Sequence, residues 1–157
     1  MKVLLAVDGS PCSEAAVAEV ATRPWPAGSE FRIVSAYQLP MSPTPEAWAI
    51  PPEYYDEMEK AARGQAQKIV DLATAQLKQT LGKLMAVRGQ VLAGSPPSVI
   101  VEEADGWPAD LIVVGSHGYG AWQRLVLGSV SQAVVLHAKC SVEVVRRCQK
   151  ATSVEAA

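Results

Sequence analysis

The stretch from Asp110 to Ser131, DLIVVGSHGYGAWQRLVLGSVS, constrains the fold more than any other part of this sequence. Its apolar run at 111–114 ends at a glycine, and Ser129 opens a second amphipathic segment after glycines at 115, 118, 120 and 128. This order predicts a buried strand, a glycine-rich loop and the start of a helix. Glycines at this spacing allow positive φ angles and close approach of a ligand, so several N–H groups can converge on an anion. The stretch therefore predicts a phosphate-binding loop beside a helix N-terminus.

The loop lacks the residues that mark the two commonest nucleotide-binding motifs. Gly115 and Gly120 match the glycine spacing of the P-loop, but Ala121-Trp122 stand where Lys and Ser/Thr are required, and no GxGxxG follows the first predicted strand. A bound polyphosphate would therefore rest chiefly on backbone amides near 115–120 and 128–131. Arg124 is the only nearby cation, and it could face either the ligand or the solvent. Three hydroxyls could add contacts, those of Ser116, Ser129 and Ser131.

The length and composition of the chain are those of one globular domain. It has 157 residues, of which 49% are hydrophobic and 19% are charged, so it can bury a core of ordinary size. We expect one domain over residues 1–147, followed by a polar C-terminal tail at 148–157.

Charge and cysteine content argue against several classes of protein. The formal net charge is −2, so no basic field suggests a nucleic-acid partner. The three cysteines have no CxxC spacing, which argues against a disulfide framework and a structural zinc site. Asp8 interrupts the N-terminal apolar run too early for a signal peptide, and no apolar stretch is long enough to span a membrane. We expect a soluble cytoplasmic protein.

Strand and helix patterns alternate along the whole chain. Apolar runs predict five strands, at 3–7, 31–37, 84–92, 111–114 and 142–145. The helices predicted between them lie at 14–20, 53–81, 98–104 and 130–138. This alternation predicts an α/β fold with a single five-stranded parallel sheet and helices on both faces, a Rossmann-like open sandwich.

Small residues mark the expected helix boundaries. Ser10 or Ser13 can cap the first helix, and Ser95 can cap the third, because prolines follow at the first helical positions. Gly82 is expected to end the long second helix.

Four predicted strands should end at the same edge of such a sheet. Asp8, Ala36, Gly94 and Gly115 close or follow these strands, and open parallel sheets bind ligands beyond the carboxyl ends of their strands. These positions should therefore border one crevice. For Asp8 two interpretations stay open, a simple turn former or a carboxylate that contacts the ligand. The proline-rich segment 38–52 could be a lid over this edge or a surface connection.

Two parts of the sequence together resemble a known family. The pattern Gly115-x-x-Gly118, then nine residues, then Gly128-Ser129 follows an apolar strand, and the chain opens with Val7-Asp8-Gly9-Ser10. This two-part signature resembles that of the nucleotide-binding universal stress proteins. The resemblance covers residues 2 to about 147.

The resemblance implies an α/β domain of strand order 3-2-1-4-5 that binds ATP, or AMP, ADP or cyclic AMP in its place, with or without Mg²⁺. Asp8 would meet the ribose or an associated metal, main-chain groups near Ala36 would contact the adenine, and Gly94 would line the pocket. The family's usual homodimer pairs the final strands antiparallel, which places Val142 and Val144 at the interface. Six residues would surround the phosphates: Gly115, His117, Gly118, Gly128, Ser129 and Val130.

The final predicted strand departs from the family pattern in two places. Ser141 stands where proline is frequent, and Glu143 adds a charge that could point outward or across the two-fold axis.

Three functions stay open from the sequence. The first is a nucleotide-binding regulatory protein with slow or no hydrolysis and a protein partner still to be identified. The second is an enzyme that hydrolyses ATP or adenylates a substrate, although neither an HxGH pair nor an SGGxDS loop is present. The third is a dimeric interaction module without nucleotide. Because His117 lacks a paired nucleophile or acid, we expect no catalytic residues and favour the first function.

Overall fold

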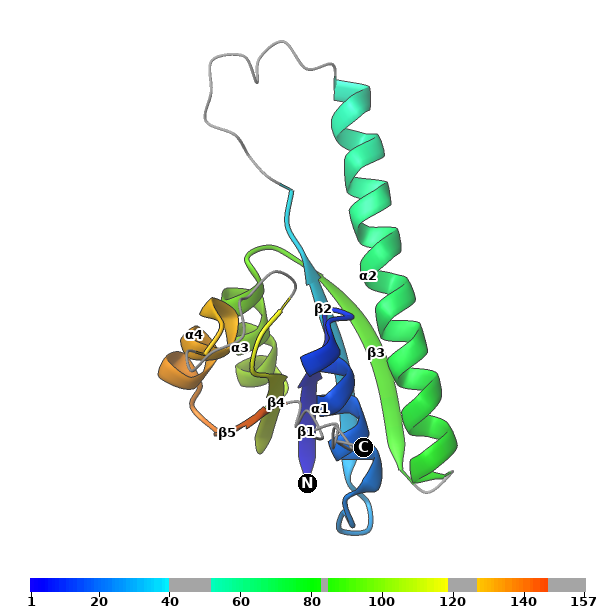
Figure 1. Ribbon diagram of the computed structural model, residues 1–157, viewed down its shortest axis with the longest axis vertical. Helices are drawn as coiled ribbons and strands as arrows, with labels where there is room; N and C mark the ends of the chain where they lie inside the picture. The colour runs from blue at the N-terminus through cyan, green and yellow to red at the C-terminus, as the bar shows by residue number, and fades with distance from the viewer. Residues whose placement is uncertain (40–51, 83–84, 119–126, 147–157) are drawn as a thin grey trace, which may run out of the picture.

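The computed structural model describes residues 1–39, 52–82, 85–118 and 127–146. Within these ranges strands and helices alternate along the chain (Figure 1). The elements are β1 (Lys2–Ala6), α1 (Pro11–Thr22), β2 (Glu30–Tyr37), α2 (Pro52–Leu81), β3 (Ala86–Ala93), α3 (Pro96–Gly106), β4 (Leu111–Gly115), α4 (Ser129–His137) and β5 (Ser141–Val145). The predicted strands and helices are confirmed, with boundaries that shift by a few residues. Most of the proline-rich segment, the middle of the glycine-rich loop and the C-terminal tail lie outside the described residues.

All five strands run parallel in one sheet of order β3-β2-β1-β4-β5. β1 lies at the centre, where Leu4 pairs with Arg32 of β2 on one side and with Ile112 of β4 on the other. The strand order confirms the expectation from the family resemblance. The winding direction reverses between β1 and β4, so a ligand site is expected beside the carboxyl ends of these two strands.

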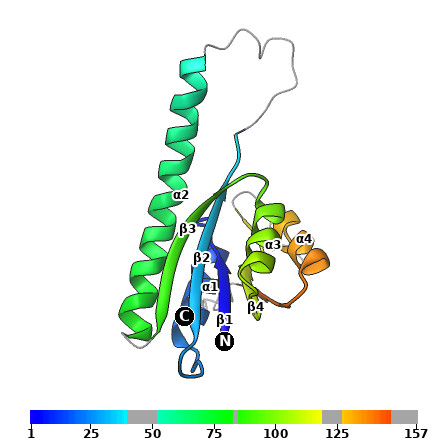
Figure 2. The same cartoon turned by 180° about the vertical axis from the view of Figure 1, so that it is seen from behind.

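Two helices cover each face of the sheet (Figures 1 and 2). On one face, α1 and α2 bury Val17, Val20, Val70 and Leu77 against the strands. On the other face, α3 and α4 pack through side chains that include Ile100 and Val134. β1 and β4 contribute buried side chains to both layers, which explains why their sequences are continuous apolar runs.

The helix starts show which serine acts as a cap. The hydroxyl of Ser10 accepts a hydrogen bond from the N–H of Ser13 at 3.3 Å, so Ser10 caps α1. Ser95 is the N-cap residue of α3, as predicted, but its side chain makes no capping hydrogen bond. Pro97 stands at the second helical position and carries no N–H, so one of the two donors that an N-cap side chain normally satisfies does not exist.

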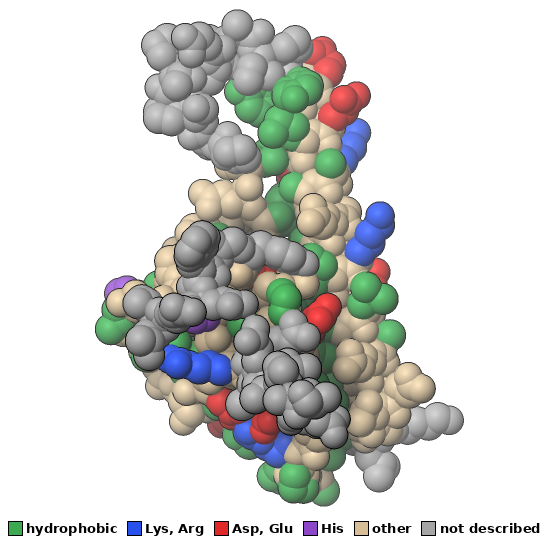
Figure 3. All heavy atoms as spheres, in the orientation of Figure 1, with side chains coloured by type: hydrophobic (Ala, Val, Ile, Leu, Met, Phe, Trp, Pro, Cys, Tyr) green, Lys and Arg blue, Asp and Glu red, His purple; other side chains and the backbone are tan. Residues whose placement is uncertain are grey.

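α2 is 30 residues long and extends past the carboxyl edge of the sheet (Figures 1 and 2). Charged side chains lie along its outer side (Figure 3). The hydroxyl of Tyr37 at the end of β2 donates to Glu59 of α2 at 3.1 Å, and burial together with this carboxylate raises the pKa of Tyr37. Gly82, with a φ of 76°, follows the last helical residue as predicted. No helix in the described ranges combines the length and hydropathy needed to cross a membrane.

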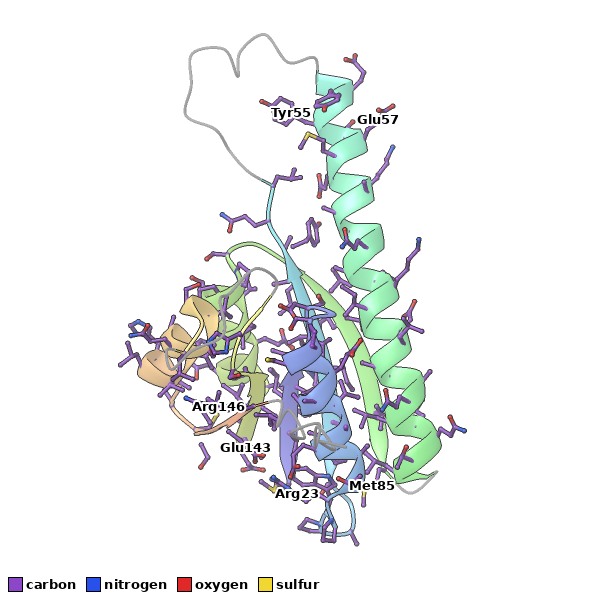
Figure 4. The ribbon with its side chains drawn as sticks, in the orientation of Figure 1. Arg23, Tyr55, Glu57, Met85, Glu143 and Arg146 are labelled. Carbon is purple, nitrogen blue, oxygen red and sulfur yellow. The ribbon has the colours of Figure 1, made fainter. Side chains whose placement is uncertain are left out.

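The carboxylate of Glu143 in β5 binds Arg23, which follows α1 (Figure 4). Both terminal nitrogens of Arg23 donate to Glu143 at 2.7 Å, and one also donates to Glu19 at 2.9 Å. These carboxylates raise the pKa of Arg23 above its ordinary value. The charge at position 143 is therefore paired with Arg23 within the chain.

Candidate functional site

A cavity of about 340 Å³ lies at the carboxyl edge of the sheet, beside the ends of β1 and β4. Small-molecule pockets typically measure roughly 300–1,000 Å³, so the space suits an organic ligand. The lining residues come from three strands, from the turn after β1, from the loop after β4 and from the N-terminal parts of α1, α3 and α4. The site therefore forms where the topology predicts it.

Apolar side chains make up one part of the cavity wall. They come from the ends of β1, β2 and β4 and from α3. Because α3 begins with two prolines, its first two residues offer no N–H donor on this side. This part of the wall favours an apolar or aromatic portion of a ligand. The apolar lining residues are Ala6, Val7, Val34, Ala36, Pro96, Ile100 and Val114.

The N-terminus of α4 supplies hydrogen-bond donors to the cavity. Gly128 is the N-cap, and the first N–H that bonds back within the helix is that of Gln132, to the Gly128 carbonyl at 2.9 Å. The N–H groups of 129–131 therefore have no partner within the helix, and these three residues line the cavity. Free N–H groups and the positive end of the helix dipole together favour an anion.

Two glycine-containing turns are held side by side at this end of the cavity. The carbonyl of Ser116 accepts hydrogen bonds from the Gly128 N–H at 2.8 Å and from the Ser131 hydroxyl at 3.0 Å. The same hydroxyl lies 3.0 Å from the Gly128 carbonyl. Because its proton is directed at carbonyl oxygens, Ser131 offers the cavity acceptor lone pairs and its backbone N–H, but no free hydroxyl donor.

Gly115 is required by the approach of α1 to β4. A Cβ at this position would lie 2.7 Å from the carbonyl carbon of Cys12 and 2.8 Å from the nitrogen of Ser13, both backbone atoms in the first turn of α1. Such distances exclude any side chain unless the helix moves. Glycine here thus permits close packing of helix and strand, in the way that one glycine of a dinucleotide-binding fold does.

Gly118 and Gly128 are required by contacts among the turns themselves. A Cβ on Gly118 would lie 2.7 Å from Oδ2 of Asp8, and one on Gly128 would lie 3.2 Å from the carbonyl oxygen of Ser116. Gly115, Gly118 and Gly128 all lack a positive φ, so the left-handed conformation that glycine would allow is not used at these three positions. The lack of a side chain at these glycines, and not a special backbone conformation, allows the turns to pack.

Asp8 is both a turn former and a lining residue. Its Oδ1 accepts a hydrogen bond from the N–H of Ser10 at 2.9 Å, and its own N–H donates to the hydroxyl of Ser13 at 3.2 Å. The turn role of Asp8 is therefore confirmed, and the same turn places its exposed carboxylate at the cavity, where contact with a ligand stays a prediction. Of the described lining residues, Asp8 alone carries a carboxylate. One carboxylate suits a Mg²⁺ ion that is already coordinated by phosphates, and no group of three or more His, Cys, Asp or Glu among the described residues could hold a metal by itself.

Most residues predicted for the site line the cavity. They are Val7, Asp8, Ala36, Gly115, His117, Gly118, Gly128, Ser129, Val130 and Ser131. Gly9, Ser10, Gly94 and Ser116 are not among the lining residues. Ser10 stabilises the loop after β4, because its hydroxyl donates to the His117 carbonyl at 3.2 Å. The N–H of Gly94, which has a φ of 136°, bonds to the Tyr37 carbonyl at 2.9 Å. Gly120 and Arg124 lie outside the described residues.

Sequence reasoning missed several lining residues: Ala6, Ser13, Val34, Pro96, Ile100 and Val114. Side-chain periodicity could have found Val34, because it lies two residues before Ala36, a predicted site residue, and shares its face of the strand. Pro96 and Ile100 share a face of α3, but neither was predicted, so periodicity could not lead from one to the other.

The comparison with known proteins identifies relatives along nearly the whole chain. The model of the "Universal stress protein family" matches residues 1–146. A universal stress protein of Thermus aquaticus is 35% identical over 144 residues, which cover 92% of this chain and 97% of that protein. A Mycobacterium tuberculosis universal stress protein, Rv1996, is 30% identical over 91% of this chain, and the chain spans 47% of its length.

Solved structures share the fold. The universal stress protein UspA of Lactobacillus plantarum superposes with a TM-score of 0.74 at 23% identity, covering 93% of this chain and 97% of its own. A family member of Arabidopsis thaliana with AMP bound superposes with a TM-score of 0.68 at 18% identity, and the match covers 99% of this chain and 97% of that protein. Two others, one of them from Archaeoglobus fulgidus, were solved in complex with cAMP and dAMP and give TM-scores of 0.62 and 0.54, at 24% and 22% identity.

Proposed function

The chain belongs to the universal stress protein family, and on this premise we propose that it binds an adenine nucleotide in the cavity beside β1 and β4. Binding, rather than catalysis, is the activity proposed. The nucleotide is ATP or a related adenine nucleotide such as AMP, ADP or cyclic AMP, and its occupancy would regulate a protein partner.

The composition of the cavity wall is the observation that carries this proposal. An apolar wall from β2 and α3 adjoins a set of N–H donors at the start of α4. A nucleotide has the matching chemistry, because its base is flat and largely apolar at its faces and its phosphates are anionic. Three related structures support the same assignment: the Arabidopsis protein holds AMP, the Archaeoglobus protein holds dAMP, and a third universal stress protein holds cAMP.

Each part of the wall has a role in this proposal. The phosphates accept hydrogen bonds from the N–H groups of 129–131, and the base lies against Val34 and Ile100. Asp8 binds the ribose, or a Mg²⁺ ion that accompanies a triphosphate. None of the described lining residues pairs with another as nucleophile and base, which favours a binding protein over an enzyme.

Calorimetric titration tests the proposal directly. The purified chain is titrated with adenosine, AMP, ADP, ATP and cyclic AMP, each with and without Mg²⁺. We expect saturable binding of at least one phosphorylated ligand, and weaker binding of adenosine because it lacks the anion. No binding of any nucleotide at millimolar concentration would contradict the proposal and favour the nucleotide-free interaction module. ATP turnover of about 1 s⁻¹ or faster would favour the enzyme instead.

We also propose that the chain forms a homodimer through the outer edge of β5. The Val145 carbonyl accepts a hydrogen bond from the Ser116 N–H at 2.8 Å, on the side of β4. Since backbone groups alternate in direction along a strand, those of Val142 and Val144 face away from β4, at the outer edge of the sheet. Edge strands of this kind pair with other strands when nothing covers them.

The substitution Val144→Pro is expected to convert a dimer into a monomer without unfolding it. Proline removes the outward N–H but is tolerated on an edge strand. Light scattering after size-exclusion chromatography measures the mass, and Val144→Ala, which keeps the N–H, is the matched control. A wild-type chain that is monomeric at high micromolar concentration would contradict the dimer.

A further inference from the structure

Glu143 is a charged residue at the middle of β5, the strand whose outer edge is proposed to pair with a second copy of the chain. Val142 and Val144 pack into the apolar layer of α3 and α4, so Glu143 points to the opposite face of the sheet, toward α1. Its side chain is 28% exposed. Charged side chains on edge strands normally prevent strands of different molecules from pairing. Glu143 therefore opposes the proposed dimer unless another group compensates its charge.

Pairing of two β5 strands would bring two Glu143 side chains together. An antiparallel pair about a two-fold axis satisfies all the outward backbone groups of β5 when Val142 pairs with Val144 of the partner subunit. Glu143 then lies directly opposite Glu143 of the partner subunit. If Val142 or Val144 instead pairs with its own copy, the two glutamates become diagonal neighbours on the same face. Like charges at such positions destabilise a strand pair.

Arg23 compensates this charge from within the same chain. Its two terminal nitrogens donate to the two carboxylate oxygens of Glu143 at 2.7 Å (Figure 4), the bidentate geometry of a strong ion pair. One of these nitrogens also donates to Glu19 at 2.9 Å, and the guanidinium lies 5.1 Å from the centre of the Trp25 ring. These contacts hold the guanidinium in place before a partner arrives, so little conformational entropy is lost there on association.

Resting on the proposed homodimer, we infer that Arg23 determines whether β5 can pair with a second copy of the chain. It neutralises Glu143 in each protomer, so that two strands with like charges at their centres can meet. The four side chains form one network of alternating charge across the two-fold axis. An edge strand that carries an uncompensated carboxylate at this position would be repelled.

The dimer dissociation constant of Arg23→Met tests this inference. Methionine keeps an apolar side chain of similar length but removes the charge, which leaves Glu143 without its counter-ion. We expect the dimer to weaken roughly 10- to 100-fold, within the range that Coulomb's law gives for two unit charges about 5 Å apart between water and a protein surface. Sedimentation velocity over a concentration series at low salt measures the constant. A variant that dimerises as tightly as the wild type would overturn the inference.

Arg32→Met is the matched control for this measurement. Arg32 also binds a carboxylate, that of Glu103, and both partners are about as buried as Arg23 and Glu143. It lies on β2, which two other strands separate from β5. We expect the Arg32→Met chain to dimerise as the wild type does. Equal weakening of both variants would indicate a general loss of stability and overturn the inference.

The double variant Arg23→Met with Glu143→Gln separates charge from folding. It lacks the ion pair, as Arg23→Met does, but it also lacks the carboxylate that would be repelled. We therefore expect its dissociation constant to return close to that of the wild type. If the double variant dimerises as weakly as Arg23→Met, Arg23 only supports the fold of this edge, and the inference is overturned.

Salt provides a second measure of the repulsion. The screening length falls from about 10 Å at 0.1 M to about 3 Å at 1 M salt, so the defect of Arg23→Met should shrink as salt is added. A defect that salt leaves unchanged would overturn the inference while leaving the proposed homodimer intact. A wild-type chain that stays monomeric at high micromolar concentration would overturn both.

Discussion

Replacing Ser129 with proline is expected to lower the affinity for AMP roughly 10- to 100-fold, since a hydrogen bond to a charged group contributes about 1.5–3 kcal/mol. Ser129 is the first residue of α4, and its N–H is one of the three proposed phosphate donors. Proline removes that N–H and is well tolerated at the first helical position. Gly128 before it has φ −61° and ψ 154°, a conformation that a residue preceding proline readily adopts.

Ser129→Ala is the control that separates the amide from the hydroxyl. It keeps the N–H and removes only the side-chain oxygen, so we expect a much smaller loss than with proline. Far-UV circular dichroism and thermal denaturation should show that both variants fold as the wild type does. If the alanine and proline variants lose the same affinity for AMP, the hydroxyl is the phosphate donor. If proline has no effect, the N-terminus of α4 does not bind the phosphate.

Gly115→Ala is expected to destabilise the fold by about 1–3 kcal/mol, the usual cost of overpacking. The added methyl would lie 2.7 Å from a backbone carbon of α1. A flexible side chain could rotate to relieve such a clash, but a helix backbone cannot. For a chain of this size, the melting temperature should fall by roughly 2–12 °C. Differential scanning calorimetry without ligand measures the effect.

Gly64→Ala is the matched control, and it should raise the melting temperature instead of lowering it. Gly64 lies within α2, and nothing lies within 4 Å of the Cβ that alanine would add. Because glycine is a poor helix former, alanine should stabilise the chain by roughly 0.5–1 kcal/mol. An unchanged melting temperature for Gly115→Ala, with the expected increase for Gly64→Ala, would show that α1 can move away from β4 at little cost.

The fold could be predicted because its signals are local. Continuous apolar runs such as 3–7 identify strands that are buried on both faces, and the spacing of apolar residues along 53–81 identifies one long helix. Alternation of the two element types then leaves few topologies. The strand order itself came from the family resemblance and is confirmed.

The physical role of the residues in the site could be predicted only in part. The glycine spacing located the turns, but not the reason for each glycine, because the neighbour that crowds Gly115 is Cys12, a residue about a hundred positions away in the sequence. Ser116 was expected to face the ligand, and the structure directs its hydroxyl toward Cys12 and His117 instead. The partner of Glu143 could not be predicted for the same reason, since it depends on where Arg23 lies in space.

The crowding of Gly115 by α1 changes how this glycine motif should be interpreted in other sequences. A related chain that bound no nucleotide would still need glycine at this position, because the demand comes from the architecture of the domain. Its retention would therefore say nothing about ligand binding. If the proposed function holds, the informative positions are the residues that begin α4, where a change that blocks the N–H groups would reveal loss of the ligand even in a chain that folds normally.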